Sequence, residues 1–291
     1  GIVTLMIKTL VLIACLLSLT SAAVPEDALL NFTQLMDKYN YPYQVHQITT
    51  QDGYILTYFR IQGKNQTIAP GKPVALLMHG LLNSAEGWVF NYENVSLAYV
   101  LANKGFDVWL GNSRGNKFST GHKTLDPAVN SSYWDFSFQE MGEYDLPAVF
   151  EYIAELTGQM INYIAHSQGT AQMFAVLSDQ NPTVNKYLRK FAALAPVTTL
   201  NHIQSTQMKL GFALPLVTVG ETLGWTSMSP FDPKDAYRNA WICTYIPMKC
   251  RLDTYLSMNE VLDYDNTDRY FMQAAHCPAG TSLKSLVHWR Q

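Results

Sequence analysis

Residues 160–170 read MINYIAHSQGT, an apolar run that ends in a serine between small residues. The run is β-branched and aromatic, which predicts a strand, and QGTAQMFAVLS at 168–178 has apolar residues at helical spacing. Ala165 and Gly169 flank Ser167 at two positions on either side, and their small size permits a sharp turn from strand into helix. Such a turn holds the serine hydroxyl clear of the sheet, so we predict that Ser167 is a nucleophile.

Strands and helices alternate on both sides of this turn. After residue 73 the pattern predicts strands at 74–78, 106–110, 160–165 and 191–196, with helices at 96–104, from about Asp145 or Leu146 to 156, and at 168–178. Alternation of this kind indicates βαβ units and a mostly parallel central sheet. Upstream we predict an outer helix at 26–39 and a β-hairpin formed by 43–50 and 54–61.

The character of the chain changes at residue 197. Segments 210–225, 240–249 and 251–262 are helical or irregular, and no further buried, β-branched strand is predicted before Gln291. We therefore divide the sequence into a signal peptide at 1–22, an α/β core at 23–196 and a helical cap at 197–291.

Composition restricts the classes of function. The 291 residues are 48% hydrophobic and 15% charged, with a net charge of -3, so the chain can bury a large core. No cluster of Lys and Arg offers a surface for nucleic acid or for an anionic membrane. The dinucleotide-binding, P-loop and HExxH motifs are missing, so we expect no cofactor and no metal.

The amino-terminal sequence predicts export. An apolar run at 9–19 precedes small residues at 20–23, and the run is about half of the ~20 residues that a membrane-spanning helix needs. We expect a signal peptide rather than a transmembrane anchor, with the mature chain starting near Ala23 or Val24. Four Asn-X-Ser/Thr sequons, at Asn31, Asn65, Asn94 and Asn130, are candidate glycosylation sites.

Cysteine usage fits the secretory route. Cys15 lies in the predicted signal peptide, and the mature chain keeps Cys243, Cys250 and Cys277. An odd number allows one disulfide and one free thiol. Spacing alone leaves the pairing open.

Four further stretches, taken with the serine turn, carry a resemblance to a known family. They are LMHGLLNS at 77–84, FDVWLGNSRGN at 106–116, YWDFSFQEMGEYDLPA at 133–148 and HCPAGTSLKSLVHWRQ at 276–291. In order and spacing the sequence resembles the acid lipase family of α/β-hydrolases, which includes gastric and lysosomal acid lipases. The resemblance implies an α/β-hydrolase fold with a helical cap. It also implies a secreted or lysosomal monomer that hydrolyses neutral lipid esters at a lipid–water interface in lipid catabolism, through an acyl-serine intermediate.

The fold that this resemblance implies also locates an oxyanion hole. His79-Gly80-Leu81 follows the strand at 74–78, where an α/β-hydrolase places one backbone donor, and the second comes from the residue after the nucleophile. We assign the N–H groups of Leu81 and Gln168 to these positions. Each donor could lower the barrier by roughly 3 kcal/mol.

Other polar and aromatic residues near the predicted sheet edge receive structural interpretations. We expect Arg114 to pair with a nearby carboxylate such as Asp107 rather than with substrate. Tyr133, Trp134, Phe136 and Phe138 are expected to pack against the sheet rather than to face lipid. His166, beside the nucleophile, is expected to be structural.

The residues that would complete a catalytic triad are not identified in this sequence. A serine needs a histidine to take its proton and a carboxylate to orient that histidine, in the chain order Ser, Asp or Glu, His. Asp263 or Asp268 followed by His276 or His288 has this order, but these residues and His202 fall in the predicted cap, with no buried strand to bring them to the sheet edge. We expect the triad Asp and His, and the last strands, to lie beyond Gln291. The alternative is a catalytically silent, secreted lipid-binding protein of the same fold.

Overall fold

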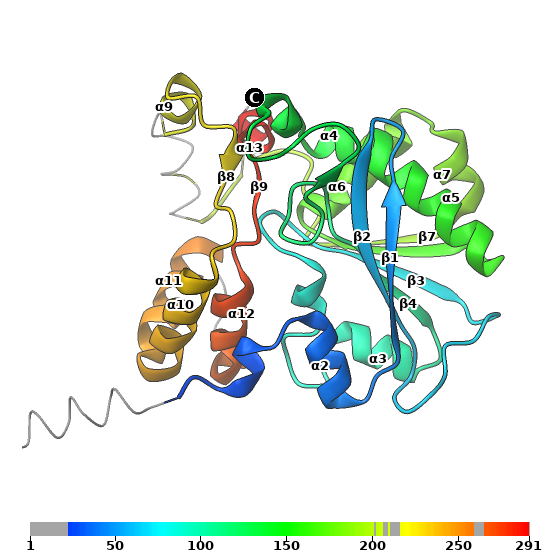
Figure 1. Cartoon of the computed structure of the whole chain (residues 1–291), viewed down its shortest axis with the longest axis horizontal. Coiled ribbons are helices and arrows are strands. Elements are labelled where there is room, and N and C mark those ends of the chain that lie inside the picture. The colour runs from blue at the N-terminus through cyan, green and yellow to red at the C-terminus, as the bar shows by residue number, and fades with distance from the viewer. Residues whose placement is uncertain (1–22, 201, 206–208, 210–215, 259–264, 291) are drawn as a thin grey trace, which may run out of the picture.

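The computed structural model describes residues 23–290 except 201, 206–208, 210–215 and 259–264. The predicted signal peptide at 1–22 and Asp263 therefore lie outside the described residues. A sheet with helices on both faces forms one side of the molecule, and the helices of the C-terminal part gather on the other (Figure 1).

The central sheet is mixed, with a parallel part that contains the serine turn. Its order is β1(Tyr43–Thr49), β2(Tyr54–Ile61), β4(Asp107–Leu110), β3(Val74–Met78), β6(Ile161–His166) and β7(Leu188–Leu194), and β5(Gly121–His122) pairs with β2. The β1 and β2 strands form the predicted antiparallel hairpin. Strands β4, β3, β6 and β7 are parallel neighbours, as the alternation of strands and helices predicts. The last of them begins earlier than the predicted strand at 191–196.

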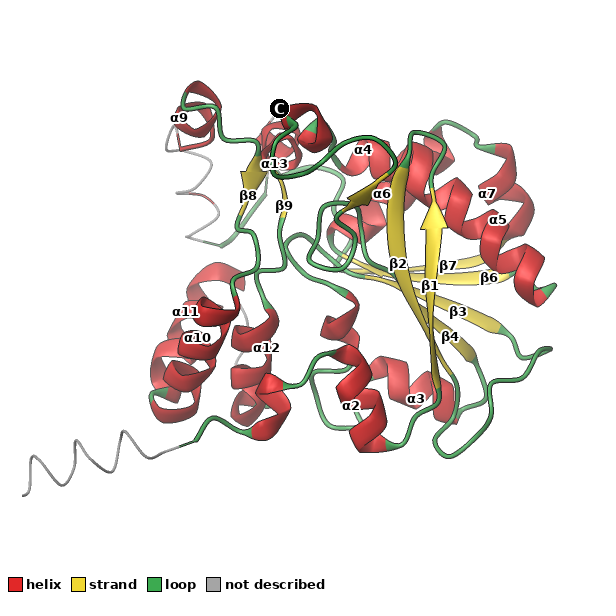
Figure 2. Cartoon of the chain, in the orientation of Figure 1, coloured by secondary structure: helices red, strands yellow, loops and turns green. Residues whose placement is uncertain are grey.

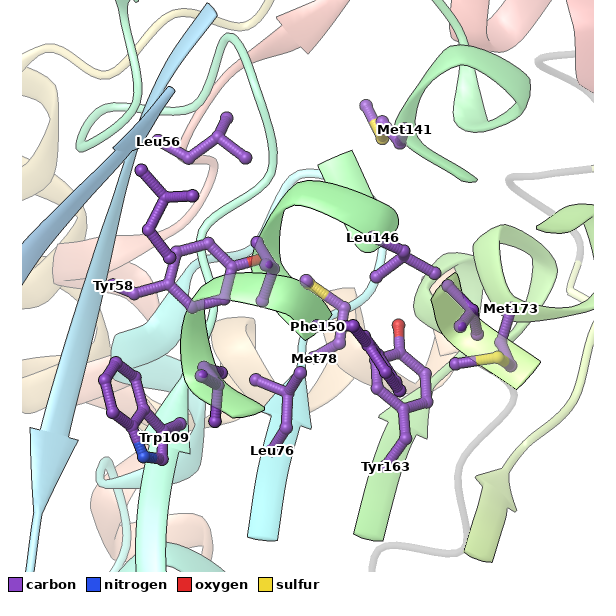
Figure 3. Packing of buried hydrophobic residues seen from close by; sticks show 14 of the residues in the cluster. Leu56, Tyr58, Leu76, Met78, Trp109, Met141, Leu146, Phe150, Tyr163 and Met173 are labelled. Atoms are coloured by element: carbon purple, nitrogen blue, oxygen red, sulfur yellow. The ribbon is translucent and has the colours of Figure 1, made fainter. Parts of the chain in front are cut away.

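Apolar side chains on the two faces of the sheet form two cores. Tyr58, Leu76 and Tyr163 point to one face, where they pack with α5(Leu146–Thr157) and α6(Gln168–Ser178) (Figure 3). On the opposite face, Phe59, Leu77 and Leu110 pack with α2(Phe32–Tyr39) and α3(Leu97–Asn103). This alternation explains the continuous apolar sequence of β3, all of which is buried. The sheet is the middle layer, shown with its covering helices in Figure 2.

The helices differ from the prediction in two places. Instead of one helix at 26–39, the chain forms η1(Glu26–Leu29) and then α2, because Asn31 caps α2 by accepting a hydrogen bond from the Gln34 N–H. Helix α5(Leu146–Thr157) begins at Leu146, as predicted, but α4(Phe138–Glu140) and η4(Met141–Asp145) precede it and were not predicted as separate elements. Pro147 lies at the start of α5, as predicted.

The C-terminal part consists mainly of helices, as predicted. They are α9(Leu216–Thr222), α10(Pro233–Tyr245), α11(Pro247–Met258), η6(Thr267–Arg269), α12(Tyr270–His276) and α13(Leu283–Arg290). The prediction missed a two-stranded ribbon of β8(Ser227–Met228) and β9(Thr281–Ser282), which are too short to give a period-two pattern. No helix in the described ranges is long and apolar enough to span a bilayer.

Two consecutive helices of this part carry the cysteines that form the disulfide. Cys243 in α10 and Cys250 in α11 form a disulfide, with their Cα atoms 5.5 Å apart. Cys277 is a free thiol. Burial raises the pKa of this thiol to about 12, so it stays protonated at neutral pH.

Remaining short elements connect the sheet to its surroundings. Two of them are η2(Ala85–Trp88), which follows the loop after β3, and η3(Ser131–Trp134), which precedes α4. A third, α7(Pro182–Tyr187), leads from α6 into β7.

Candidate active site

Ser167 occupies the sharp turn between β6 and α6. Its backbone has φ 52° and ψ -120°, a conformation that favours glycine and is strained for serine. The Ser167 N–H donates to the carbonyl of Leu194 (3.0 Å) in the neighbouring strand. The Ser167 carbonyl accepts from the Thr170 N–H (2.8 Å) and hydroxyl (2.6 Å). These three bonds hold the strained turn in place.

Two glycines permit the close packing of this turn. A Cβ atom on Gly169 would lie 2.8 Å from the carbonyl oxygen of His79 and 2.9 Å from that of Met78. A Cβ atom on Gly80 would lie 3.0 Å from the Cβ atom of Ser167. The loop after β3 and the serine turn after β6 are therefore in direct contact, as the adjacent pairing of these strands requires.

His79 connects the start of this loop to the neighbouring strand end. Its Nδ1 lies 2.7 Å from the Gly80 carbonyl oxygen, so Nδ1 carries the hydrogen, and its Nε2 accepts from the Ser113 N–H (3.1 Å). Protonation of Nε2 would remove the acceptor of the Ser113 N–H and would place a charge in the buried interior. Burial therefore lowers the pKa of His79 to about 4, and the ring is neutral at pH 7. This role of His79 was not predicted from the sequence.

The two predicted oxyanion donors lie on either side of the turn. Gln168 is the first residue of α6, where an N–H group has no acceptor within the helix and the helix dipole favours negative charge. Leu81 follows Gly80, and its N–H donates to no acceptor in the described part of the chain. Its side chain packs with Val217, Leu283 and Leu286. Their assignment as oxyanion donors is part of the function proposed below.

The Gln168 side chain is also held in place. The Trp289 indole N–H donates to its Oε1 (3.2 Å), and its amide approaches the sulfur of Met141 (3.7 Å). The contact with Trp289 was not predicted, because no local sequence pattern relates α13 to the start of α6.

A cleft lies beside the serine turn. Its volume is about 280 Å³, and its walls include His79, Gly80, Trp88, His166 and Arg269. His166 is exposed and contributes its ring to this wall, so it is not a core residue. The cleft lies between the sheet edge and α12, which begins directly after Arg269.

Three of the residues considered for the triad bind other partners. The Nδ1 of His276 is 2.9 Å from Glu86 Oε2, and the Nδ1 of His288 is 2.9 Å from the Ser137 hydroxyl. Asp268 accepts a hydrogen bond from the Tyr92 hydroxyl, and His202 is exposed in a turn. Within the described residues, no hydrogen bond reaches the Ser167 hydroxyl.

The predicted partner of Arg114 is wrong. Asp107 instead binds Arg60 (2.6 Å), while Arg114 binds both Asp52 (2.6 Å) and Asp145 (2.6 Å). The guanidinium also lies 3.9 Å from the centre of the Tyr54 ring. Arg114 was predicted to have a structural rather than a substrate-binding role, and its buried ion pairs agree with that role. The partner was missed because Asp52 lies in the hairpin turn, far away in sequence.

The aromatic run after residue 132 mostly packs inward, as predicted. Tyr133 and Phe136 are fully buried in the core, and Trp134 packs against it. Phe138 differs, because its ring stacks on His288 (4.2 Å between centroids) and contacts Trp289. No group of three or more His, Cys, Asp or Glu side chains that could hold a metal occurs among the residues with described positions.

Two family models and several curated relatives match this chain. Residues 32–92 match the family model described as a partial alpha/beta-hydrolase lipase region, and residues 73–224 match that of the alpha/beta hydrolase fold. The chain is 38% identical to gastric triacylglycerol lipase of Rattus norvegicus, covering 91% of this chain and 68% of the relative. It is 40% identical to lysosomal acid lipase/cholesteryl ester hydrolase of the same species, with 94% and 69% covered. Lipase member K of Homo sapiens is 39% identical, with 91% and 67% covered.

Solved structures with similar folds are more distant. An alpha/beta hydrolase from Novosphingobium aromaticivorans aligns with a TM-score of 0.42 and 15% identity, covering 81% of this chain and 64% of that one. An esterase from Pyrococcus furiosus aligns with a TM-score of 0.45 and 18% identity, covering 65% and 62%.

Proposed function

The chain belongs to the lipase family of α/β-hydrolases that includes the gastric and lysosomal acid lipases, and on that premise we propose that it hydrolyses neutral lipid esters through an acyl intermediate on Ser167. The observation that carries the proposal is the strained Ser167 turn packed against Gly80. Strain of about 1–3 kcal/mol at one residue persists only where the surrounding structure enforces it, and such sites cluster where function requires them.

The proposed reaction has two steps. Ser167 Oγ forms a bond to the ester carbonyl carbon, the bond to the alcohol oxygen breaks, and the serine proton leaves with the alcohol. Water then attacks the acyl-serine, which releases the fatty acid and restores the hydroxyl. The N–H groups of Leu81 and Gln168 stabilise the negative oxygen in both steps, as proposed donors of an oxyanion hole.

The substrate class follows from the relatives and from the cap. Triacylglycerol and cholesteryl ester occur in the names of the relatives, and both are neutral esters. We propose the division into a core at 23–196 and a cap at 197–291, with the cap shielding an acyl chain. Both glycerol and sterol esters therefore belong in the first assay.

The location and assembly of the protein form part of the same proposal. A secretory route to the exterior or to lysosomes fits the sequons, because Asn31, Asn65 and Asn94 are exposed and Asn130 is half-buried. The Asn31 cap uses Oδ1 and leaves the amide nitrogen free for a glycan. We propose that the protein acts as a monomer at a lipid–water interface. Light scattering that gave the mass of a dimer would contradict this.

Turnover with a matched nucleophile variant tests the proposed activity. The full-length wild-type protein and its Ser167→Ala variant are compared on emulsified trioctanoylglycerol and cholesteryl oleate, with released fatty acid as the readout. We expect wild-type turnover and a loss of at least about 10³-fold in the variant. Equal rates would remove Ser167 from the mechanism. Binding of both emulsions without turnover would favour the silent lipid-binding alternative.

A further inference from the structure

The loop that supplies Leu81 is bound to a segment almost 200 positions away in the sequence. We call residues 79–84 the oxyanion loop. The Ala279 N–H donates to the Leu82 carbonyl (2.8 Å), and the Ala279 carbonyl accepts from the Lys117 N–H (2.8 Å). The Cys277 thiol also lies 3.4 Å from Asn83 Oδ1. Two residues of the segment at 276–279 therefore contact two consecutive residues of the oxyanion loop, directly after Leu81.

A buried ionic cluster lies at the start of that segment. Glu86 Oε2 lies 2.9 Å from His276 Nδ1 and 2.5 Å from Lys117 Nζ. Burial raises the pKa of Glu86, but the hydrogen bonds and charges of His276 and Lys117 outweigh burial, so the pKa is lowered. An ionised carboxylate only accepts, and therefore His276 Nδ1 is the donor. The cluster connects α12 to η2, which directly follows the oxyanion loop.

Burial strengthens the contacts that hold this cluster in place. The side chains of Glu86 and His276 are 1% and 6% exposed, so water does not compete for their hydrogen bond. The His276 ring also packs against Phe90, with 5.1 Å between the ring centroids. A ring held on one edge by a carboxylate and on its face by an aromatic side chain has a single orientation. The segment at 276–279 is thereby held in one position.

We propose that His276 is a positioning residue that, through Glu86, holds the segment at 276–279 against the oxyanion loop and so fixes the Leu81 N–H. This role rests on the proposed function. A histidine hydrogen-bonded to a glutamate has the composition of a catalytic pair, but here the carboxylate lies on η2 and the pair joins two parts of the fold. No hydrogen bond within the described residues joins His276 to Ser167, so we assign His276 to positioning and not to taking the proton of Ser167.

Two substitutions at the same position separate a positioning role from a packing role. His276→Phe keeps an aromatic ring but loses the Nδ1 donor, whereas the amide nitrogen of His276→Asn can take the place of Nδ1. Each full-length variant is treated with a fluorophosphonate, and the maximal labelling rate and the half-saturating concentration are measured separately. His202→Phe is the control, because His202 is exposed in a turn.

A misplaced oxyanion donor should lower the labelling rate rather than the affinity for the probe. We expect His276→Phe to lower the maximal labelling rate about 10- to 100-fold with little change in half-saturation, since a 1 Å misplacement can cost about 10²-fold. His276→Asn should return to within about threefold of wild type. A wild-type rate in His276→Phe, a change in half-saturation alone, or equal losses in both variants would overturn the proposal.

Hydrogen exchange gives a readout that does not require chemistry at Ser167. His276→Phe should accelerate exchange in the peptide covering 79–90, and His276→Asn should not. Absence of labelling in the wild-type protein would contradict the proposed function, and hydrogen exchange would then decide the positioning role. Unchanged exchange at 79–90 in His276→Phe would overturn that role, whatever the outcome of labelling.

Discussion

Gly80 and Ser167 lie so close together that a Cβ atom at position 80 would stand 3.0 Å from the Cβ atom of Ser167. Each residue follows the end of a parallel strand, and the two strands are neighbours, with Met78 paired to Ala165. The proposed nucleophile and the proposed oxyanion loop therefore leave the sheet at the same edge, where ligands of open α/β sheets bind.

The Gly80→Ala variant should slow the reaction of Ser167. Its methyl group would crowd Ser167 Cβ and the His166 ring, also at 3.0 Å, and would push the oxyanion loop away from the turn. We expect about a 10²-fold loss in the rate of fluorophosphonate labelling. Gly121→Ala is a control with similar crowding, because its Cβ would lie 3.1 Å from Ile55 Cβ at a strand that pairs with β2. Equal labelling losses in both variants would point to general destabilisation.

Ser167→Gly should be more stable than Ser167→Ala, although both variants lack the nucleophile. Ser167 has a φ of 52°, and glycine adopts this conformation without the steric cost that a Cβ atom imposes. Ser167→Gly should therefore have a free energy of unfolding about 1 kcal/mol higher than that of Ser167→Ala. Urea titration of the two variants measures the difference. A Ser167→Gly protein that is less stable than Ser167→Ala would show that the turn is not strained.

Stability should fall at acid pH because of His79. The pKa of His79 is about 4 in the folded protein, against about 6.5 in the unfolded chain, so the unfolded chain binds more protons between these values. Neutral His79 makes its full contribution to the free energy of unfolding above about pH 6.5. About 3 kcal/mol of that free energy is lost as the pH falls to 4. Urea titrations at pH 7, 5.5 and 4.5 measure the free energy of unfolding. This free energy should fall less with decreasing pH in His79→Asn than in wild type. Parallel curves would refute the assignment.

The buried ion pairs of Arg114 should make this residue important for folding. In Arg114→Met, Asp145 would remain buried without its partner, and such unpaired charges cost about 3–5 kcal/mol. Arg238→Met is the matched control, because its pair with Asp235 is 65% and 55% exposed and is worth about 1 kcal/mol or less. Unfolding midpoints in urea compare the two. Similar small shifts would show that the Arg114 pairs add little.

Much of the fold could be predicted because its local patterns are strong. Strand β3 and helix α6 have the predicted bounds, since one is apolar throughout and the other has regular apolar spacing between a small-residue turn and Asp179. The prediction of a single helix at 26–39 was wrong, because the capping hydrogen bond of Asn31 outweighs the continuous apolar spacing. Strands β8 and β9 were missed, since they depend on tertiary pairing.

The candidate site was only partly predictable for the same reason. Ser167, Leu81 and Gln168 belong to two local motifs, and the pairing of β3 with β6 brings those motifs together. The contacts that hold the site are long-range, such as Glu86 with His276 and Gln168 with Trp289. No local spacing encodes these pairs. They follow only from the position of the C-terminal part against the sheet.

The most direct measurement is to locate the covalent label of a fluorophosphonate by peptide mass spectrometry on the full-length protein. The probe transfers its phosphonyl group to an activated serine as fluoride leaves, so it reports the nucleophile itself. The structure predicts a single modified peptide that carries the label on Ser167, and no label in Ser167→Ala. A label on another serine, or equal labelling of wild type and Ser167→Ala, would contradict the assignment of Ser167 as the nucleophile.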